Sequence, residues 1–299
     1  MKSHLDRLAS ERRWTYRASR DSSAEPAAWA AMALAAYGRL AEAAEPANWL
    51  AELQQPNGAV GVNQAEVEPC WPTSLAMLAW HSLDKTTTST RFRQHIERAV
   101  NWSLADCGEA APRSPEIGHD TEIVGWSWAA ATHSWLEPTC FFVLALNAVG
   151  LKKHVRTRDG VRLVRDRLLA EGGANYGNTV VMGQTLLPHV QPTGLAMLVL
   201  ASEGDADGRV AKSLRYLEES IDEQTPPASL SFACLGLTAY NRRPPAATDW
   251  VQRCLEANHP ALSTYERSLL LLAALPDASW LASARAATLS DLTSVKVRP

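Results

Sequence analysis

The feature that most constrains the fold is a short segment that recurs along the chain, in which a proline opens an almost wholly apolar run. The clear copies are "EPAAWAAMALAAYG" from Glu25, "WPTSLAMLAWHSL" from Trp71, "EPTCFFVLALNAVG" from Glu137 and "QPTGLAMLVLAS" from Gln191. Weaker copies start at Pro226 and, without the proline, at Ser263. Proline is tolerated in the first turn of a helix and pushes the residue before it out of helical geometry, so each copy predicts the start of a helix. A short helix that is apolar on nearly every side is buried on every side.

Helices of a second kind are predicted between these copies, at 91–105, 161–170 and 209–221, where apolar residues share one face and charged residues the other. Alternation of buried and amphipathic helices predicts an all-α fold, an α/α toroid with an inner and an outer ring and about six helical hairpins. An open α-solenoid is the alternative. Its repeats have a fixed length, whereas the prolines here are unevenly spaced, with the longest interval between Pro72 and Pro138.

Length and composition set the class of protein. We expect a single toroid domain over 1–299, with the repeats within about 10–275 and a C-terminal tail at about 285–299. The net charge of -3 gives no basic surface of the kind that nucleic acid requires. No apolar run reaches the roughly 18 residues of a membrane span. The five cysteines form no C-x-x-C pair and the N-terminus has no apolar leader, so we expect reduced thiols in a cytoplasmic protein.

The apolar segments carry a family likeness. "EPTCFFVLAL", "QPTGLAMLVL" and "WPTSLAMLAW" resemble the repeats of the prenyltransferase and squalene-cyclase family, in which a glycine–aromatic turn precedes the helix. The stretches at 53–62 and 171–180 and the "GWSW" at 125–128 look like eroded copies of that turn. The resemblance implies the terpenoid cyclase and protein prenyltransferase toroid, with an aromatic-lined cavity that holds an isoprenoid or similar apolar ligand. It also implies a partner chain or a second copy, because a lone toroid lacks the second domain that closes the cyclase cavity.

The chain departs from that family at the catalytic motifs. Neither D-x-D-D nor D-D-x-x-D occurs, and Asp106 lies directly beside Cys107, which is the wrong spacing for the D-x-C pair of zinc-binding prenyltransferases. We therefore expect no metal and no cofactor, and leave open whether the protein is an isoprenoid-handling cyclase, isomerase or transferase. The alternative function is a non-catalytic toroid that serves as a binding or scaffold protein for a partner chain.

The candidate site lies in and around "GHDTEIVGWSWAAATHSWLEPTC", which begins at Gly118. His119, Asp120 and Glu137 are the candidate acid and base residues, because the toroid brings the starts of the inner helices to one mouth. The candidate ligand-binding residues are aromatic: Trp126, Trp128, Trp135, Trp71, Trp29 and Tyr176. The extra length before Pro138 predicts an insertion, so we expect the segment from His119 to Trp135 to cross the mouth with at least one tryptophan facing the cavity.

Other interpretations of the same residues stay open. Glu137 could cap its helix and the tryptophans could only pack the insertion onto the bundle. Glu25 and Glu68 resemble Glu137 in their place before a helix. Glycoside-cleaving α/α toroids use two carboxylates with aromatic stacking platforms, and Asp120, Glu122 and Glu137 with three tryptophans fit that description, although the repeats do not favour it.

Overall fold

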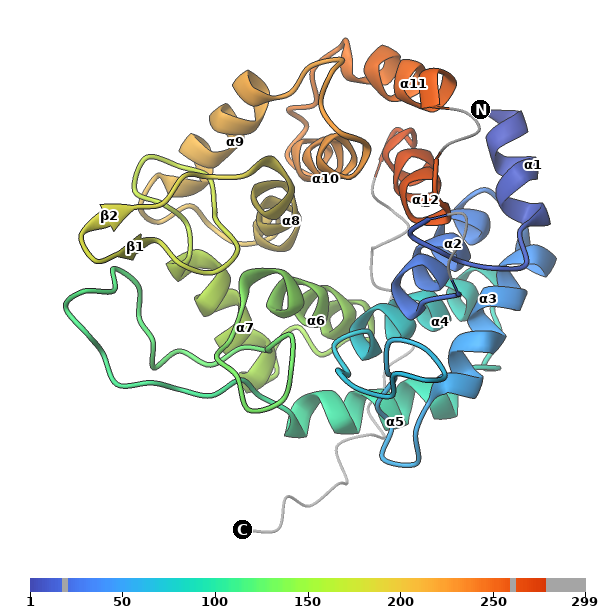
Figure 1. The fold of residues 1–299 in the computed structure, drawn as a ribbon, viewed down its shortest axis with the longest axis horizontal. Helices are drawn as coiled ribbons and strands as arrows, with labels where there is room; N and C mark the ends of the chain where they lie inside the picture. Colours follow the sequence, from blue (N-terminus) through green and yellow to red (C-terminus); the bar gives the residue numbers. More distant parts are fainter. Residues whose placement is uncertain (18–20, 259–261, 278–299) are drawn as a thin grey trace.

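The computed structural model describes residues 1–17, 21–258 and 262–277, and the predicted tail at about 285–299 lies outside these ranges. Within them the chain forms twelve α-helices and one two-stranded hairpin (Figure 1). The helices are α1 (Lys2–Ser10), α2 (Ala24–Ala36), α3 (Leu40–Leu53), α4 (Thr73–Thr87), α5 (Arg93–Ala105), α6 (Leu136–Ala148), α7 (Val155–Asp166), α8 (Val190–Leu200), α9 (Arg209–Ser220), α10 (Pro227–Thr238), α11 (Ala247–Asn258) and α12 (Thr264–Ala273). The hairpin pairs β1 (Val180–Val181) with β2 (Gln184–Thr185) antiparallel.

The even-numbered helices form a closed inner ring. Each of α2, α4, α6, α8, α10 and α12 packs against the next, and α12 packs against α2, which closes the circle (Figure 1). The odd-numbered helices lie outside them, and α1 contacts α12, α2 and α3, so the N-terminal helix occupies the outer position where the ends of the chain meet. The predicted all-α toroid is confirmed. The amphipathic segments predicted at 91–105 and 209–221 are the outer helices α5 and α9, and the one predicted at 161–170 overlaps the outer helix α7, which ends at Asp166.

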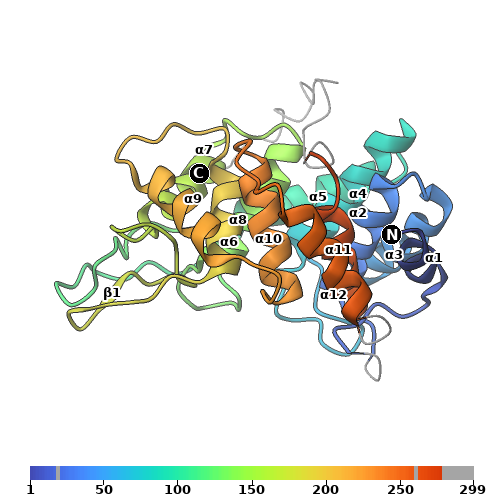
Figure 2. The same ribbon diagram turned by 90° about the horizontal axis from the view of Figure 1, so that it is seen from above.

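The repeated prolines open inner helices, as predicted. Pro26, Pro138 and Pro192 lie in the first turns of α2, α6 and α8, and Pro72 is the residue directly before α4. The four helices are buried along almost their whole length. Figure 2 shows the ring from the side, with the loop before α2 and the β1–β2 hairpin toward the same end. We call this end, where the inner helices begin, the mouth.

Three aromatic side chains fill the axis of the ring. Trp29 of α2, Phe141 of α6 and Phe232 of α10 come from alternate inner helices, and each is at most 3% exposed. Their ring centroids are 6.1 Å (Trp29–Phe141), 5.7 Å (Trp29–Phe232) and 6.4 Å (Phe141–Phe232) apart. Side chains from helices that are not neighbours in a ring can meet pairwise only across its centre. These three side chains therefore plug the ring at its axis.

A threonine after the proline holds the loop that precedes each of three inner helices. The hydroxyl oxygens of Thr73, Thr139 and Thr193 accept hydrogen bonds from the backbone N–H groups of Val60 (2.8 Å), Trp126 (3.0 Å) and Ala174 (2.8 Å), respectively. The turns that resemble eroded glycine–aromatic copies are thus docked in the same way on α4, α6 and α8. Net stabilisation by each such buried bond is about 1 kcal/mol.

Helices α8 and α10 approach each other closely at Gly194, where a side chain would meet the backbone of Phe232 within about 2.5 Å.

In the part of the chain that the structure describes, no helix combines the length and the apolar character needed to cross a bilayer.

Candidate functional site

The floor of the mouth is built from one position of the repeat, the residue next to the proline or its equivalent. Glu25, Glu137, Gln191 and Tyr265 are each the second residue of α2, α6, α8 and α12, and Trp71 precedes the proline before α4. Because the inner helices start at the same end, these side chains converge on the axis, directly above the aromatic plug. Two of them are carboxyl groups, which we call the mouth pair: Glu25 and Glu137.

Glu137 is buried, with 6% of its surface exposed. The side-chain amide of Gln191 donates a hydrogen bond to its Oε1 over 3.0 Å. Burial raises the pKa of Glu137 to about 7, the bond from Gln191 opposes that rise, and the charge of Glu25 adds to it. Among the described residues no cation contributes to this balance, so Glu137 is a carboxyl group that holds a proton near neutral pH.

Glu25 lies in a matching environment with more donors. The Tyr16 hydroxyl donates to its Oε2, and the indole N–H of Trp29 donates to its Oε1 over 3.3 Å. Burial raises the pKa of Glu25 to about 7, and the two donors oppose the rise. The two acids come from the inner helices α2 and α6, and α4, which Trp71 precedes, lies between these helices in the ring.

The hydrogen bonds received differ between the two members of the mouth pair. Both oxygens of Glu25 receive a donor, whereas the bond from Gln191 reaches one oxygen of Glu137. Donated hydrogen bonds favour the ionised form of a carboxyl group. With these bonds in place the pKa of each carboxyl group is about 7, so near neutral pH the pair can carry one proton and one negative charge. This is the division of charge that general acid–base chemistry needs.

Aromatic rings enclose the mouth pair on the α4 and α12 sides. Trp71 meets Trp128 edge-on with 4.8 Å between ring centroids and lies nearly parallel to Phe141 at 6.2 Å. Tyr265 packs against Tyr16 at 5.2 Å. Burial, followed by the charges of Glu25 and Glu137, raises the pKa of Tyr265 well above its usual value, so its hydroxyl is neutral and lies within electrostatic reach of both acids.

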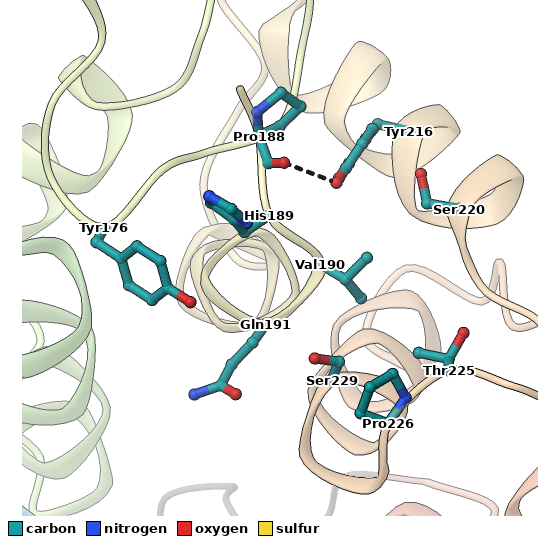
Figure 3. A pocket seen from close by; sticks show the side chains of 10 residues that line it. All are labelled: Tyr176, Pro188, His189, Val190, Gln191, Tyr216, Ser220, Thr225, Pro226 and Ser229. Carbon is teal, nitrogen blue, oxygen red and sulfur yellow. Dashed lines mark hydrogen bonds between the residues drawn. The ribbon is translucent and has the colours of Figure 1, made fainter. Parts of the chain in front are cut away.

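A pocket of about 280 Å³ adjoins Glu137 on the α8 and α10 side (Figure 3). Its lining residues are Tyr176, Pro188, His189, Val190, Gln191, Tyr216, Ser220, Thr225, Pro226 and Ser229. Gln191 links it directly to Glu137. The Tyr176 carbonyl accepts from the backbone N–H of Leu136 over 3.0 Å, so the other wall is fixed to the start of α6.

His119 and Asp120 lie away from the mouth pair, at the outer helix α7. Asp120 forms ion pairs with Arg113 and Arg162, and its backbone N–H donates to Asp166 over 3.0 Å. Burial lowers the pKa of His119 to about 4, and the charge of Arg167 adds to this effect. The expected grouping of His119 and Asp120 with Glu137 is therefore not what the structure shows. The loop that carries them runs outward to the β1–β2 hairpin, where Gly118 donates to the Val180 carbonyl over 3.0 Å.

The three tryptophans of the insertion have separate surroundings. Trp126 is fully buried outside the inner ring, where it stacks on Phe142 at 5.0 Å and donates to the Ser103 carbonyl over 2.9 Å. Trp135 precedes α6 and packs against His133 at 4.5 Å. Of the segment from His119 to Trp135, Trp128 is the tryptophan that contacts Trp71 of the mouth. Trp128 thus brings a ring of the insertion to Trp71, whereas Trp126 packs between the outer helix α5 and α6.

The alternative role of Glu137 as a helix cap is not what the structure shows, since α6 has no side-chain cap bond and its N-cap residue is Trp135. Glu68 is exposed and precedes a cis proline, and the α4 position that corresponds to Glu137 is Trp71. Within the described ranges no group of three histidine, cysteine, aspartate or glutamate side chains is arranged to hold a metal ion.

Sequence reasoning missed Glu25, Tyr16, Tyr265 and Gln191 as site residues. For Glu25 and Gln191 a signal existed, because each precedes the repeat proline as Glu137 does. Tyr265 occupies the same helical position in the copy without proline. Tyr16 belongs to no repeat, and only the folded path of the loop before α2 brings it to Glu25.

Comparison with known proteins gives a fold relationship. No protein-family model matches the chain, and no curated protein matches it. Among solved structures, the fold is similar to that of the endoglucanase Cel10, a family 8 glycosyl hydrolase from Klebsiella pneumoniae, with a TM-score of 0.57 and 13% sequence identity over 92% of this chain and 98% of that chain. At this identity the likeness establishes a shared fold.

The expected isoprenoid function is wrong. The similar fold belongs to a glycosyl hydrolase, and the axis that an isoprenoid chain would occupy is filled by Trp29, Phe141 and Phe232. The neighbour lends no support to the alternative of a non-catalytic binding toroid either. The resemblance to prenyltransferase and cyclase repeats reflected the packing of inner helices, which any closed α/α toroid requires, and carried no information about the reaction.

Proposed function

We propose that the protein is a glycoside hydrolase that cleaves an oligosaccharide or polysaccharide at the mouth, with Glu137 as general acid and Glu25 as general base. The observation that carries this proposal is the mouth pair itself, two carboxyl groups at the starts of separate inner helices, each with a pKa raised to about 7 and no compensating cation among the described residues. Glycoside hydrolysis requires two such groups on either side of the scissile bond. The similarity of the fold to that of the endoglucanase Cel10, a glycosyl hydrolase, supports the same proposal.

The proposed reaction assigns one task to each acid. Glu137 gives its proton to the glycosidic oxygen as the bond from that oxygen to the anomeric carbon breaks. Glu25 takes a proton from a water molecule whose oxygen bonds to the anomeric carbon. Both oxygens of Glu25 already accept hydrogen bonds, but each carboxylate oxygen has two lone pairs and can accept a further proton. The next turnover needs the proton on Glu137 again and Glu25 ionised.

Aromatic side chains supply the binding surface. Trp71 and Trp128 are partly exposed at the α4 side of the mouth, and their apolar faces suit the flat faces of sugar rings. Tyr265 and Tyr16 offer hydroxyl groups beside Glu25. The roles expected for Trp71, Trp128 and Tyr176 in ligand binding are retained in this proposal with a carbohydrate as the ligand.

The test is hydrolysis of a panel of neutral and acidic polysaccharides, measured as released reducing ends. We expect Glu137→Gln and Glu25→Gln each to lower kcat by about 10² to 10⁴, the usual contribution of general acid–base catalysis. A glycosyl fluoride separates the roles, because fluoride leaves without a proton. Glu137→Gln should keep most of its activity on the fluoride, and Glu25→Gln should lose it.

The matched control is Glu122→Gln, which makes the same chemical change at a glutamate exposed beside α7. Circular dichroism checks that each variant is folded. Full activity of a folded Glu137→Gln variant on a polysaccharide, or failure of the wild type to hydrolyse any glycan, would overturn the proposal.

A further inference from the structure

The pocket beside Glu137 is lined mostly by side chains with hydroxyl, amide or imidazole groups. Its polar groups are the hydroxyls of Tyr176, Tyr216 and three small residues (Ser220, Thr225 and Ser229), with the Gln191 amide and the His189 imidazole. None of the lining residues is lysine, arginine, aspartate or glutamate. Figure 3 shows Tyr176 and His189 on one side of the pocket and Tyr216 with Thr225 on the other. Such a surface matches a ligand rich in hydroxyl groups that carries no charge.

The walls of the pocket are fixed before any ligand arrives. The Tyr216 hydroxyl donates to the Pro188 carbonyl over 3.0 Å, which ties α9 to the loop before α8. The Tyr176 and His189 rings pack at 5.1 Å between centroids. The Tyr216 oxygen donates its proton to Pro188 and is also hydrogen-bonded to the Ser220 side chain, so one lone pair remains to accept from a ligand hydroxyl. A site with its side chains held in place loses less entropy on binding.

The contacts of the two acids decide which part of a substrate this pocket can hold. Gln191, which lines the pocket, is hydrogen-bonded to Glu137. The hydrogen-bond partners of Glu25 are Tyr16 and Trp29, and neither lines the pocket. A general acid protonates the leaving oxygen, so a sugar held in a pocket that adjoins Glu137 is the one that departs.

We infer that this pocket binds the sugar unit on the leaving-group side of the scissile bond, and that this unit is neutral. The inference rests on the proposed function, since it takes Glu137 as the acid. Thr225 and Pro226 also line a neighbouring pocket of about 500 Å³ toward α11, so the groove continues beyond the first unit. Two connected pockets suit a saccharide chain better than a single sugar. The ring faces of Trp71 and Trp128 would then bind the sugar on the other side of the scissile bond.

The experiment compares two substrates that share the glycone and differ in the leaving group: an oligosaccharide of the sugar that the wild type cleaves, and the corresponding glycosyl fluoride. Ser229→Trp fills the pocket. The ratio of kcat/KM for the oligosaccharide to kcat/KM for the fluoride should fall at least tenfold. Ala211→Trp makes a small-to-large change on the exposed face of α9 outside the pocket and should leave the ratio within about twofold. Thr225→Trp, in the loop before α10, replaces Ser229→Trp if that variant does not fold.

A ratio that is unchanged in Ser229→Trp, while the wild type hydrolyses glycans, overturns this inference and leaves the proposed function standing. A second measurement covers the other case. Saturation-transfer NMR on the wild type, with glucose, xylose, mannose and glucuronic acid as probes, should show binding of a neutral sugar whose Kd rises at least fivefold in Ser229→Trp. Binding of that kind without hydrolysis of any glycan would reject the proposed function and the leaving-group assignment that rests on it, and would leave standing a pocket that binds a neutral sugar. No binding of a neutral sugar, or preference for glucuronic acid, would reject the pocket assignment.

Discussion

Two groups of acids in this molecule have opposite surroundings. The mouth pair, Glu25 and Glu137, is surrounded by neutral donors and aromatic rings, and burial raises the pKa of both to about 7. The outer-edge cluster, which comprises Asp120, Glu122 and Asp166 with Arg113, Arg162 and Arg167, matches carboxylates with guanidinium groups. Asp120 has a side chain only 12% exposed, so burial alone does not separate the two groups. The difference is the presence of a cation.

This comparison shows why a stretch of sequence rich in acids, histidines and tryptophans need not form a functional site. Glu137 of the mouth pair and the acids of the outer-edge cluster at 120 and 122 all lie near histidines and tryptophans in the linear sequence. Arginines supplied from α7, far along the chain, turn the outer-edge cluster into a structural network. The mouth pair has no such partner among the described residues, and a buried carboxyl group with no cation must hold a proton or be costly to ionise.

The largest expected effect on stability is a gain. Glu137 has a folded pKa of about 7 against 4.5 when unfolded, so between these values the folded state binds more protons and stability falls as pH rises. Glu137→Gln removes this loss and should raise the free energy of unfolding by about 3 kcal/mol at pH 8, with little change at pH 4. Urea unfolding at pH 4, 6 and 8 measures it. An equal effect at pH 4 and pH 8 would mean that Glu137 does not hold its proton in the folded protein.

Tyr16→Phe should produce a smaller change that is confined to Glu25. The variant removes the hydroxyl that donates to Oε2, and the pKa of Glu25 rises because its charged form loses a donor. Glu25 must be ionised to act as a base, so the acidic limb of the kcat/KM profile should move to higher pH by about one unit. The basic limb, which belongs to Glu137, should stay in place. Movement of both limbs together would show that Tyr16 acts on the whole mouth rather than on Glu25.

Much of the fold was readable from the sequence, because the signals are local. Proline, an apolar helix and an amphipathic helix recur in each repeat, and uneven spacing pointed to a closed ring. The position of Glu137 followed from the same repeat. The placement of His119 and Asp120 did not follow, because the loop that carries them is fixed by Val180 and Asp166, about 46 residues or more away along the chain.

The tryptophans illustrate the same limit. Trp126 and Trp128 are two residues apart in "GWSW", yet Trp126 packs under α7 with the Arg156 guanidinium 4.4 Å from its ring, and Trp128 reaches Trp71 at the mouth. The docking of Trp126 on Thr139 sets this alternation. No periodicity in the sequence distinguishes the two rings, since the outcome depends on which one meets a threonine of the next helix.

Asp120→Asn tests the outer-edge cluster, where we expect the free energy of unfolding to fall rather than to rise as in Glu137→Gln. The change removes the charge that pairs with Arg113 and Arg162 but keeps an oxygen that can accept from the backbone N–H of Glu122, now 3.1 Å from Oδ1. We expect the free energy of unfolding to fall by about 1 kcal/mol at pH 7 and activity to stay within about twofold. The loss should shrink in 1 M NaCl because both arginines are exposed to solvent. A loss of activity above tenfold would place Asp120 in the reaction after all.

Glu122→Gln should have the smallest effect, and it decides what the gain at Glu137 means. The two substitutions make the same chemical change and remove the same formal charge from a protein that already carries a net charge of -3. Glu122 is 60% exposed and its ion pair is with Arg113, which is 63% exposed, at 3.0 Å. An exposed pair of this kind contributes under about 1 kcal/mol, so the free energy of unfolding should fall by less than about 0.5 kcal/mol at pH 8. If Glu122→Gln instead stabilises the protein at pH 8 as much as Glu137→Gln does, both gains come from reducing the net negative charge. Only a gain at Glu137 without one at Glu122, measured in the same buffer by the same urea titration, assigns the effect to a buried carboxyl group that lacks a cation.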